Sequence, residues 1–237
     1  YKSTATNTGE PTYYFRGNVE NNYVSFAGFT WRIVRINEDG TIRIIMQDGI
    51  NNNANILFNS SYNYMYYTNS NAKTQLESWY QTNIGSNINL ESKVATGNYY
   101  CEQAKAKYSS SYTSESATTT VYSNYTPDFK CITDGNGKGI VNSNVGLLNY
   151  DEVVYAGGYF GKDNNNYYLS NNVSNWWTMS TSGFDNGQAI IWNCNSNGKI
   201  NVVTSYNTNL TLRPVLNLKS DILITGFGTS SDPFVVS

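Results

Sequence analysis

Short runs of alternating apolar and polar positions near the start of the chain predict β-structure between residues 13 and 46. The polar residues 37–40 within this segment end in Gly40, which can adopt a positive φ, so they predict a hairpin turn. Three runs have the length of a strand and are rich in aromatic and β-branched side chains, namely residues 23–28, 29–36 and 41–47.

Three arginines, Arg32, Arg35 and Arg43, interrupt the apolar pattern of these strands. Successive side chains of a strand point to opposite faces, so Arg43 lies opposite the face that carries Ile42 and Ile44. We therefore interpret all three arginines as cations on the solvent side or at the rim of the sheet.

Residues 71–82 carry a helical pattern, because their apolar side chains recur at positions i, i+4, i+7 and i+8. These side chains are Ala72, Leu76, Trp79 and Tyr80. Trp79 is therefore interpreted as a core anchor of an amphipathic helix.

A second helix is predicted after Asn149, because a residue type favoured at the N-cap is followed three positions later by Glu152. Asp151 and Glu152 then lie in the first turn, where acidic side chains complement the helix dipole. Gly157 and Gly158 are expected to end the helix. We interpret both acids as helix-terminal charges.

The last part of the chain, residues 175–236, returns to strand-length apolar runs separated by Gly, Asn or Thr turns. These predicted strands cover residues 176–180, 188–195, 199–205 and 212–218. Between the two strand-rich parts lie long loops rich in Asn and Tyr. Residues 1–12 are polar and are expected to be a flexible lead-in to a single domain over residues 13–237.

Residues 98–139 form an excursion that is rich in Ser, Thr and Tyr and poor in large aliphatic side chains. Cys101 and Cys131 flank its centre, and we predict a disulfide between them. Closing a loop of roughly 30 residues contributes on the order of 3–4 kcal/mol in the chain-entropy model. The third cysteine, Cys194, lies in a strand-like run and is expected to be a buried free thiol.

The end of the excursion, residues 134–139, resembles the first half of a calcium loop. However, Lys138 stands where an oxygen ligand is needed, and no glutamate follows at the closing position. This run is interpreted as a turn, and we expect neither a metal site nor a cofactor.

Composition narrows the chemistry further. The chain has no histidine among 237 residues, which removes Ser-His and Cys-His nucleophile pairs and the commonest general base at neutral pH. A net charge of −2 with scattered Lys and Arg gives no basic stripe, so nucleic acid is not an expected partner. No apolar run approaches the length of a membrane span, so no direct membrane contact is expected. With 21 tyrosines and only 14% charged residues, the surface suits an extracellular protein that contacts neutral ligands, while AT-rich codon usage is the alternative explanation of this composition.

An ordered set of motifs runs through most of the chain, although each motif alone is weak. It comprises residues 14–18 (YFRGN), 29–36 (FTWRIVRI), 76–80 (LESWY), Cys101, Cys131, 146–148 (GLL), 151–158 (DEVVYAGG), 176–180 (WWTMS), 212–218 (LRPVLNL) and 228–236 (GTSSDPFVV). This set resembles a family of uncharacterised surface proteins of low-GC Gram-positive bacteria. That family is related to the formylglycine-generating-enzyme branch of the C-type-lectin-like fold.

The resemblance implies an α+β domain of C-type-lectin-like fold, with a mixed sheet, two helices and long loops that carry variation. It also implies that the first and last strands pair, so residues 29–36 and 212–218 are expected to be neighbours. The chain departs from formylglycine-generating enzymes because it lacks their active-site cysteine pair. It also lacks the calcium-ligand set of sugar-binding C-type lectins, so neither activity carries over.

Three functions fit these observations. The first is a non-catalytic adhesion module on the bacterial cell surface, which binds a glycan or a protein through aromatic faces and amide hydrogen bonds. The expected contacts, in the loops of the closing stretch, are Trp177, Asp185, Asn186, Trp192, Tyr206 and Asn207. The tryptophans also suit the core, in which case they contact no ligand.

The second function is a structural spacer in a cell-wall-anchored protein, with no ligand of its own. The third is a glycan hydrolase that works with two carboxylates across a cleft. Its available acids show no spacing that favours a pair: Asp151, Asp163, Asp185 and Asp232.

Overall fold

The computed structural model describes residues 1–96, 100–102, 126–131, 139–170, 174–222 and 224–237. Strands make up 34% and helices 15% of the structure, so the fold is of the mixed α+β class and consists mostly of sheet. Most of the predicted excursion at 98–139, the predicted turn at 134–139 and part of the polar loop before residue 175 lie outside the described residues. That residues 13–237 form one domain stays a prediction.

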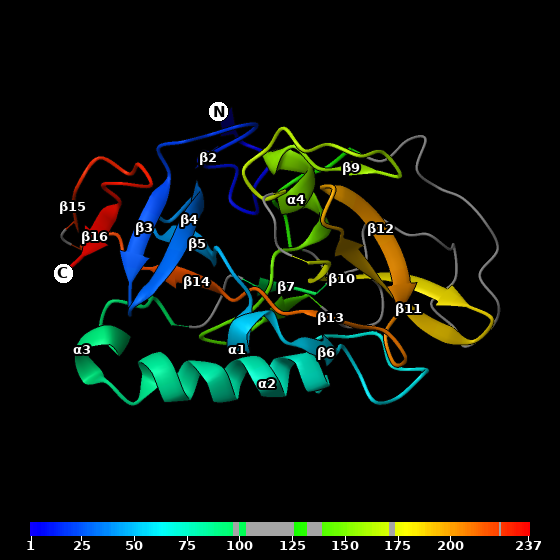
Figure 1. The fold of residues 1–237 in the computed structure, drawn as a ribbon. Helices are drawn as coiled ribbons and strands as arrows, with labels where there is room; N and C mark the ends of the chain where they lie inside the picture. Colours follow the sequence, from blue (N-terminus) through cyan, green and yellow to red (C-terminus); the bar gives the residue numbers. More distant parts are fainter. Residues whose placement is uncertain (97–99, 103–125, 132–138, 171–173, 223) are drawn as a thin grey trace.

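The larger of the sheets in the described residues has eight strands and combines both ends of the chain (Figure 1). Its main path runs in the order β1-β2-β4-β3-β16-β15, while β5 pairs with β4 on one side and with β14 on the other. The strands are β1 (Lys2–Ser3), β2 (Thr12–Tyr14), β3 (Tyr23–Phe26), β4 (Phe29–Ile36), β5 (Ile42–Met46), β14 (Val215–Leu218), β15 (Ile224–Thr225) and β16 (Phe234–Val236).

The predicted strands of the first segment are confirmed, and so is the turn between β4 and β5. Gly40 has a φ of 85°, and its N–H donates to the carbonyl of Asn37. The expected pairing of the first and last strands is wrong in detail, because β5 separates β4 from β14. The chain ends meet elsewhere, where β16 lies parallel to β3.

Residues 1–12 are part of the fold, so their assignment as a flexible lead-in is corrected. The strand β1 pairs antiparallel with β2, and the ring of Tyr1 stacks on that of Tyr14. Further along, the N–H of Phe129 donates to the carbonyl of Ala5. A polar segment can be ordered in this way, because backbone pairing does not depend on apolar side chains.

A second sheet of six strands in the described part of the chain runs in the order β6-β13-β10-β11-β12-β9. Its centre is the hairpin of β10 and β11, which is longer than predicted because β10 continues to Asp185. The strands are β6 (Asn55–Leu57), β9 (Tyr159–Phe160), β10 (Trp176–Asp185), β11 (Gln188–Cys194), β12 (Lys199–Thr204) and β13 (Asn209–Thr211). A separate ladder joins β7 (Tyr100–Cys101) to β8 (Ile140–Val141).

Both predicted helices are present, as α2 (Asn71–Tyr80) and α4 (Tyr150–Ala156). In Figure 1, α2 runs along one side of the molecule and α4 lies on the opposite side. The chain also forms a π-helical turn after α2, η1 (Gln81–Gly85), and two short helices that were not predicted, α1 (Ile50–Asn53) and α3 (Ile88–Glu91). All four apolar positions of the predicted helical pattern in α2 are buried.

The predicted disulfide between Cys101 and Cys131 is confirmed, with 5.6 Å between their Cα atoms. It ties the end of β7 to the segment that packs against the N-terminal residues, where the N–H of Cys131 donates to Asn7. The remaining cysteine, Cys194, is buried and unpaired, as predicted.

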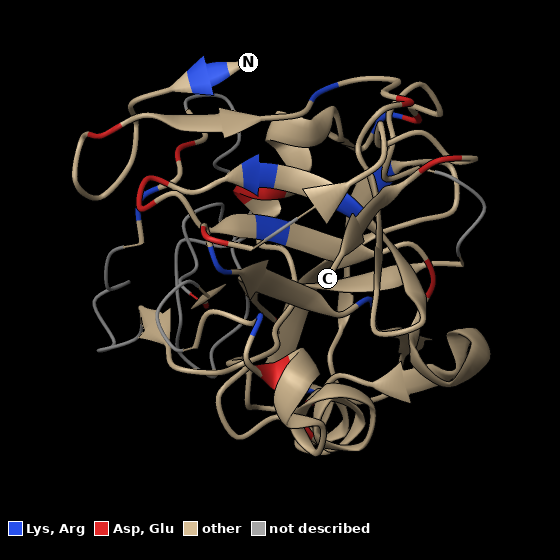
Figure 2. Cartoon of the chain, turned by 90° about the vertical axis from the view of Figure 1, so that its left-hand side faces the viewer, with Lys and Arg blue, Asp and Glu red and all other residues tan. Residues whose placement is uncertain are grey.

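The interpretation of Arg32, Arg35 and Arg43 as solvent-side cations is wrong, because the three are only 2%, 8% and 1% exposed. In Figure 2, several of the blue Lys and Arg positions lie on strands of the sheet. Arg35 and Arg43 lie opposite each other in the β4–β5 pair, and Glu152 of α4 forms ion pairs with both. The helix thus covers the face of the sheet that alternation alone assigns to solvent.

Glu152 therefore has a role that was not predicted. It completes the expected capping box with Asn149, but its carboxylate also lies 3.2 Å from Arg35 Nε and 2.5 Å from Arg43 Nε. Burial alone would raise its pKa, yet the guanidinium groups of Arg43 and Arg35 hold the pKa of Glu152 below its ordinary value. Asp151 is buried as well, so neither acid is a simple surface charge at the helix end.

Candidate functional site

Two of the predicted ligand contacts, Trp177 and Trp192, belong to the core. Both indoles have an exposed fraction of 0%. Trp177 donates from Nε1 to the carbonyl of Ile56, while Trp192 packs against the ring of Tyr150 at 4.6 Å. Their assignment as ligand contacts is corrected, because every residue of β10 except Asp185 is buried and both faces of this strand are covered.

The other predicted contacts lie on the surface, at one end of the second sheet. Asp185 and Asn186 form the exposed tip of the β10–β11 hairpin, where Asn186 has a φ of 48°. Tyr206 and Asn207 follow the end of β12, and the ring of Tyr206 lies 6.1 Å from that of Tyr62. Antiparallel pairing of β11 with both neighbours brings these two loops to the same end of the sheet. The loops are available to a ligand, but neither of them lines the two cavities described next.

The largest of these cavities has a volume of about 730 Å³ and lies on another part of the surface. We call it the arginine pocket, after the side chain of Arg32 in its wall. Its lining residues are Asn18, Val19, Glu20, Tyr23, Arg32, Asn165, Tyr167, Tyr168, Ser170, Ser196 and Asn197. Four parts of the chain contribute, namely the segment that leads into β3 together with the first residue of β3, the strand β4, the loop before residue 171 and the turn between β11 and β12.

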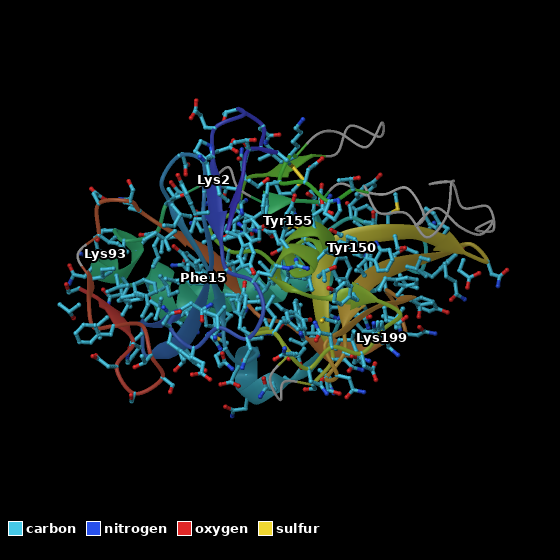
Figure 3. All side chains as sticks on the ribbon, turned by 90° about the horizontal axis from the view of Figure 1, so that it is seen from above. Lys2, Phe15, Lys93, Tyr150, Tyr155 and Lys199 are labelled. Carbon is cyan, nitrogen blue, oxygen red and sulfur yellow. A yellow bond between two sulfur atoms is a disulfide. The ribbon has the colours of Figure 1, made fainter. Side chains whose placement is uncertain are left out.

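Backbone hydrogen bonds hold the walls of the arginine pocket together. Gly17 donates to the carbonyl of Ala156 at the end of α4 and accepts from the N–H of Tyr168. On the other side, the N–H of Asn164 donates to the carbonyl of Asn197. Figure 3 labels Phe15 and Lys199, which in the sequence lie just before and just after the wall segments at Asn18 and Asn197, and it labels Tyr150 and Tyr155 of α4. The pocket is thus built on paired backbone rather than on free loops.

Arg32 is held between two tyrosine rings. The centre of its guanidinium lies 3.8 Å from the ring centroid of Tyr23 and 5.3 Å from that of Tyr168. Nε donates to Asn22 at 2.7 Å, and Nη2 donates to the carbonyl of Val19 at 2.5 Å. Among the described residues, Nη1 has no hydrogen-bond acceptor and the guanidinium has no carboxylate partner. Burial lowers the pKa of Arg32, but an arginine remains protonated at neutral pH.

The hydroxyl of Tyr168 is a second donor in the lining of this pocket. The side chain is 2% exposed, and its oxygen has no hydrogen-bond partner in the part of the chain that the structure describes. Burial raises the pKa of Tyr168 well above its ordinary value, so the group stays a neutral hydroxyl that can donate. Buried polar groups nearly always have a partner, so this hydroxyl indicates a place for a ligand or a water.

A second buried arginine, Arg213, lies behind the pocket. It donates to the carbonyls of Met46 and Leu169, while its Nη2 has no partner among the described residues. Burial, together with the nearby charge of Arg32, lowers the pKa of Arg213 to about 10. Arg213 therefore adds a second buried guanidinium near Arg32, and no ion pair joins either of them to an acid among the described residues.

Another cavity, of about 490 Å³, lies between α2 and the segment 48–53, which follows β5 and includes α1. Asn51, Asn52 and Asn53 line it with φ values of 51°, 57° and 63°, a left-handed conformation that asparagine tolerates better than most residues. Together with Asp48, they offer amide and carboxylate groups. Unlike the arginine pocket, its lining includes neither a buried guanidinium nor a buried hydroxyl without a partner, so the arginine pocket is the stronger candidate.

The remaining groups with reactive chemistry are separated or shielded. The Cys194 thiol lies 3.1 Å from the hydroxyl of Tyr167, and burial raises the pKa of Cys194 to about 11. Asp151, Asp163, Asp185 and Asp232 lie on four different elements or loops. Within the described ranges, no three His, Cys, Asp or Glu side chains come close enough to hold a metal ion. No helix there has both the length and the apolar character that crossing a bilayer requires.

Sequence reasoning did not find the arginine pocket, since Arg32 was assigned to solvent. A signal was nevertheless present, because Arg32 lies directly between Trp31 and Ile33 in a strand that contains no acidic residue. Comparisons with protein-family models, with curated proteins and with solved structures each find no match for this chain.

Proposed function

We propose that this chain is a non-catalytic binding module of the surface of a Gram-positive bacterium, which binds a glycan or a protein ligand extracellularly. It would belong to the surface-protein family that its motifs resemble and have the C-type-lectin-like fold which that resemblance implies. The arginine pocket, rather than the predicted tryptophans, would hold the ligand.

One observation carries this proposal. The pocket combines a volume of about 730 Å³ with tyrosine rings, amide side chains and hydroxyls in its wall. Ligand pockets in proteins have volumes of about 300–1,000 Å³ and fix a ligand with a few polar groups. Rings and amides together suit a polar ligand with apolar faces, such as a sugar.

The alternative hypotheses are a structural spacer and a glycan hydrolase. A spacer needs no pocket, so it gives no role to the cavity around Arg32. A carboxylate-based hydrolase uses two acids on either side of the bond it cleaves. Glu20 is the single acid among the described residues that line this pocket, which favours binding over hydrolysis.

The proposal is tested by screening the chain against a glycan array and against cell surfaces, with two tryptophan variants as a matched pair. Ser196→Trp fills the mouth of the arginine pocket, and Asn207→Trp places the same bulk in the predicted loop site. Both positions are exposed, so the free energy of unfolding of each variant should lie within about 0.5 kcal/mol of that of the wild type.

The expected result is binding by the wild type and by Asn207→Trp, with a loss of at least about tenfold for Ser196→Trp, because steric exclusion removes the whole contact. If Asn207→Trp loses binding and Ser196→Trp keeps it, the site lies in the hairpin loops and the pocket assignment is wrong. If the wild type binds nothing above background, the hypothesis of a structural spacer replaces that of a binding module.

A further inference from the structure

We propose that the arginine pocket selects an acidic saccharide, whose carboxylate pairs with Arg32 and accepts a hydrogen bond from the hydroxyl of Tyr168. This inference rests on the proposed binding function and names the class of ligand. It departs from the expectation of a neutral ligand, which the low overall charge of the chain had suggested.

The first reason is the charge balance around Arg32. The other buried guanidinium groups of the first sheet, those of Arg35 and Arg43, share the carboxylate of Glu152. Arg32 is 2% exposed, and no ion pair joins it to an acid among the described residues. A buried charge is costly unless it is paired, so an anion in the pocket would supply the missing partner.

The second reason is that two donors of the pocket remain without a partner among the described residues. Nε and Nη2 of Arg32 are satisfied by Asn22 and Val19, which leaves Nη1 for a ligand. Tyr168 contributes the buried hydroxyl without a partner, and its ring lies 5.3 Å from the same guanidinium. Two donors from neighbouring side chains suit the two oxygens of a carboxylate.

The rest of the lining favours a sugar over an acidic peptide. Tyr23 is half-buried and offers a ring face next to Arg32, and saccharides pack their C–H faces on such rings. The amides of Asn165 and Asn197 and the hydroxyl of Ser196 lie on the exposed rim, where they can bind sugar hydroxyls. Lysine, which would be expected around a peptide rich in acids, does not line the pocket in the described residues.

Glu20 opposes an anion, since it is the single acid among the described residues that line the pocket. It is exposed at the rim, so its charge is partly screened by solvent and salt. This placement makes it useful for a test, because removing its charge should strengthen the binding of an acid and leave the binding of a neutral sugar unchanged.

The experiment measures binding of the intact chain by titration calorimetry at low and at physiological ionic strength. The probes are a glucuronate-terminated oligosaccharide, its glucose-terminated counterpart, and an acidic tetrapeptide. The two sugars differ only in the carboxylate, so their difference isolates the proposed contact. We expect the glucuronate probe to bind at least about tenfold more tightly than the glucose probe, since hydrogen bonds to charged groups are the strong ones.

Two variants act in opposite directions. Tyr168→Phe removes the donor and should weaken glucuronate binding roughly tenfold or more. Glu20→Gln should strengthen it by about two- to fivefold at low salt. Tyr80→Phe is the control, because Tyr80 also has a buried hydroxyl without a partner in the described residues but lies in α2. It should leave binding unchanged.

The outcomes separate this inference from the function on which it rests. If both sugars bind equally, or if Tyr168→Phe has no more effect than Tyr80→Phe, the pocket binds glycans without selecting acids and the inference is wrong. If the tetrapeptide binds and the sugars do not, the saccharide assignment is overturned in favour of an acidic peptide. If no probe binds and the glycan and cell-surface screens are also silent, the proposed function itself fails.

Discussion

Replacing Glu152 by glutamine tests the buried ion cluster at the centre of the larger sheet. Glutamine has nearly the same shape, and its side-chain oxygen can still accept the N–H of Asn149, so the capping box can persist. The substitution removes the carboxylate that forms ion pairs with both Arg35 and Arg43. These guanidinium groups lie opposite each other in the β4–β5 pair, where like charges repel.

The expected cost follows from burial. The side chains of Arg43 and Glu152 are each 1% exposed, and that of Arg35 is 10% exposed, so solvent cannot take over the role of the carboxylate. Removing one partner of a buried ion pair costs about 3–5 kcal/mol, because it leaves an uncompensated buried charge. Since whole domains are stable by roughly 5–15 kcal/mol, the variant should lose a large part of its free energy of unfolding.

Urea unfolding at neutral pH, followed by tryptophan fluorescence, measures this loss. Glu77→Gln is the matched control, because Glu77 pairs with Lys73 on the surface of α2, and an exposed pair four residues apart contributes about 0.3–0.5 kcal/mol. A cost for Glu152→Gln no larger than that of Glu77→Gln would refute the argument that the cluster depends on a buried negative charge.

Three further predictions concern stability. The pKa of Glu152 is depressed in the folded state, so the unfolded state takes up the proton first as the pH falls. The free energy of unfolding should therefore decrease as the pH drops below about 4.3. Urea titrations at several acid pH values should show a steeper loss for the wild type than for Glu152→Gln. Cys131→Ser should lower the free energy of unfolding by about 3–4 kcal/mol, and the reduced wild type should have the same urea midpoint as the untreated variant. If neither the substitution nor the reducing agent changes the urea midpoint, the disulfide does not stabilise the fold. Trp177→Ala should cost about 3–5 kcal/mol in urea unfolding, because it removes a fully buried indole; a cost below about 1 kcal/mol would show that the indole is not in the core.

Local signals in the sequence identified several elements correctly. The spacing of Ala72, Leu76 and Trp79 predicted α2, and Asn149 with Glu152 predicted the capped start of α4. These predictions succeed because a helix depends on contacts three and four residues apart, which the sequence shows directly. The β4–β5 hairpin was predictable for a similar reason, since its turn is formed by adjacent residues.

The candidate site was less accessible to prediction, because it joins four distant parts of the chain. Alternation along β4 separates two faces but does not say that α4 covers one of them or that Tyr23 and Tyr168 enclose Arg32. The wrong assignment of Trp177 and Trp192 has the same cause, since an aromatic side chain suits a ligand site as well as a core. Pairing across long sequence separations decides between these roles.

The sequence by itself therefore determined the α+β class, the strand and helix positions set by local periodicity, and the disulfide partners. It also determined the absence of histidine chemistry. Only the tertiary structure decided which faces are covered. It shows that three arginines expected at the surface are buried. The physical reason is that periodicity records how side chains alternate, whereas burial, charge pairing and an unsatisfied hydroxyl depend on what packs against them.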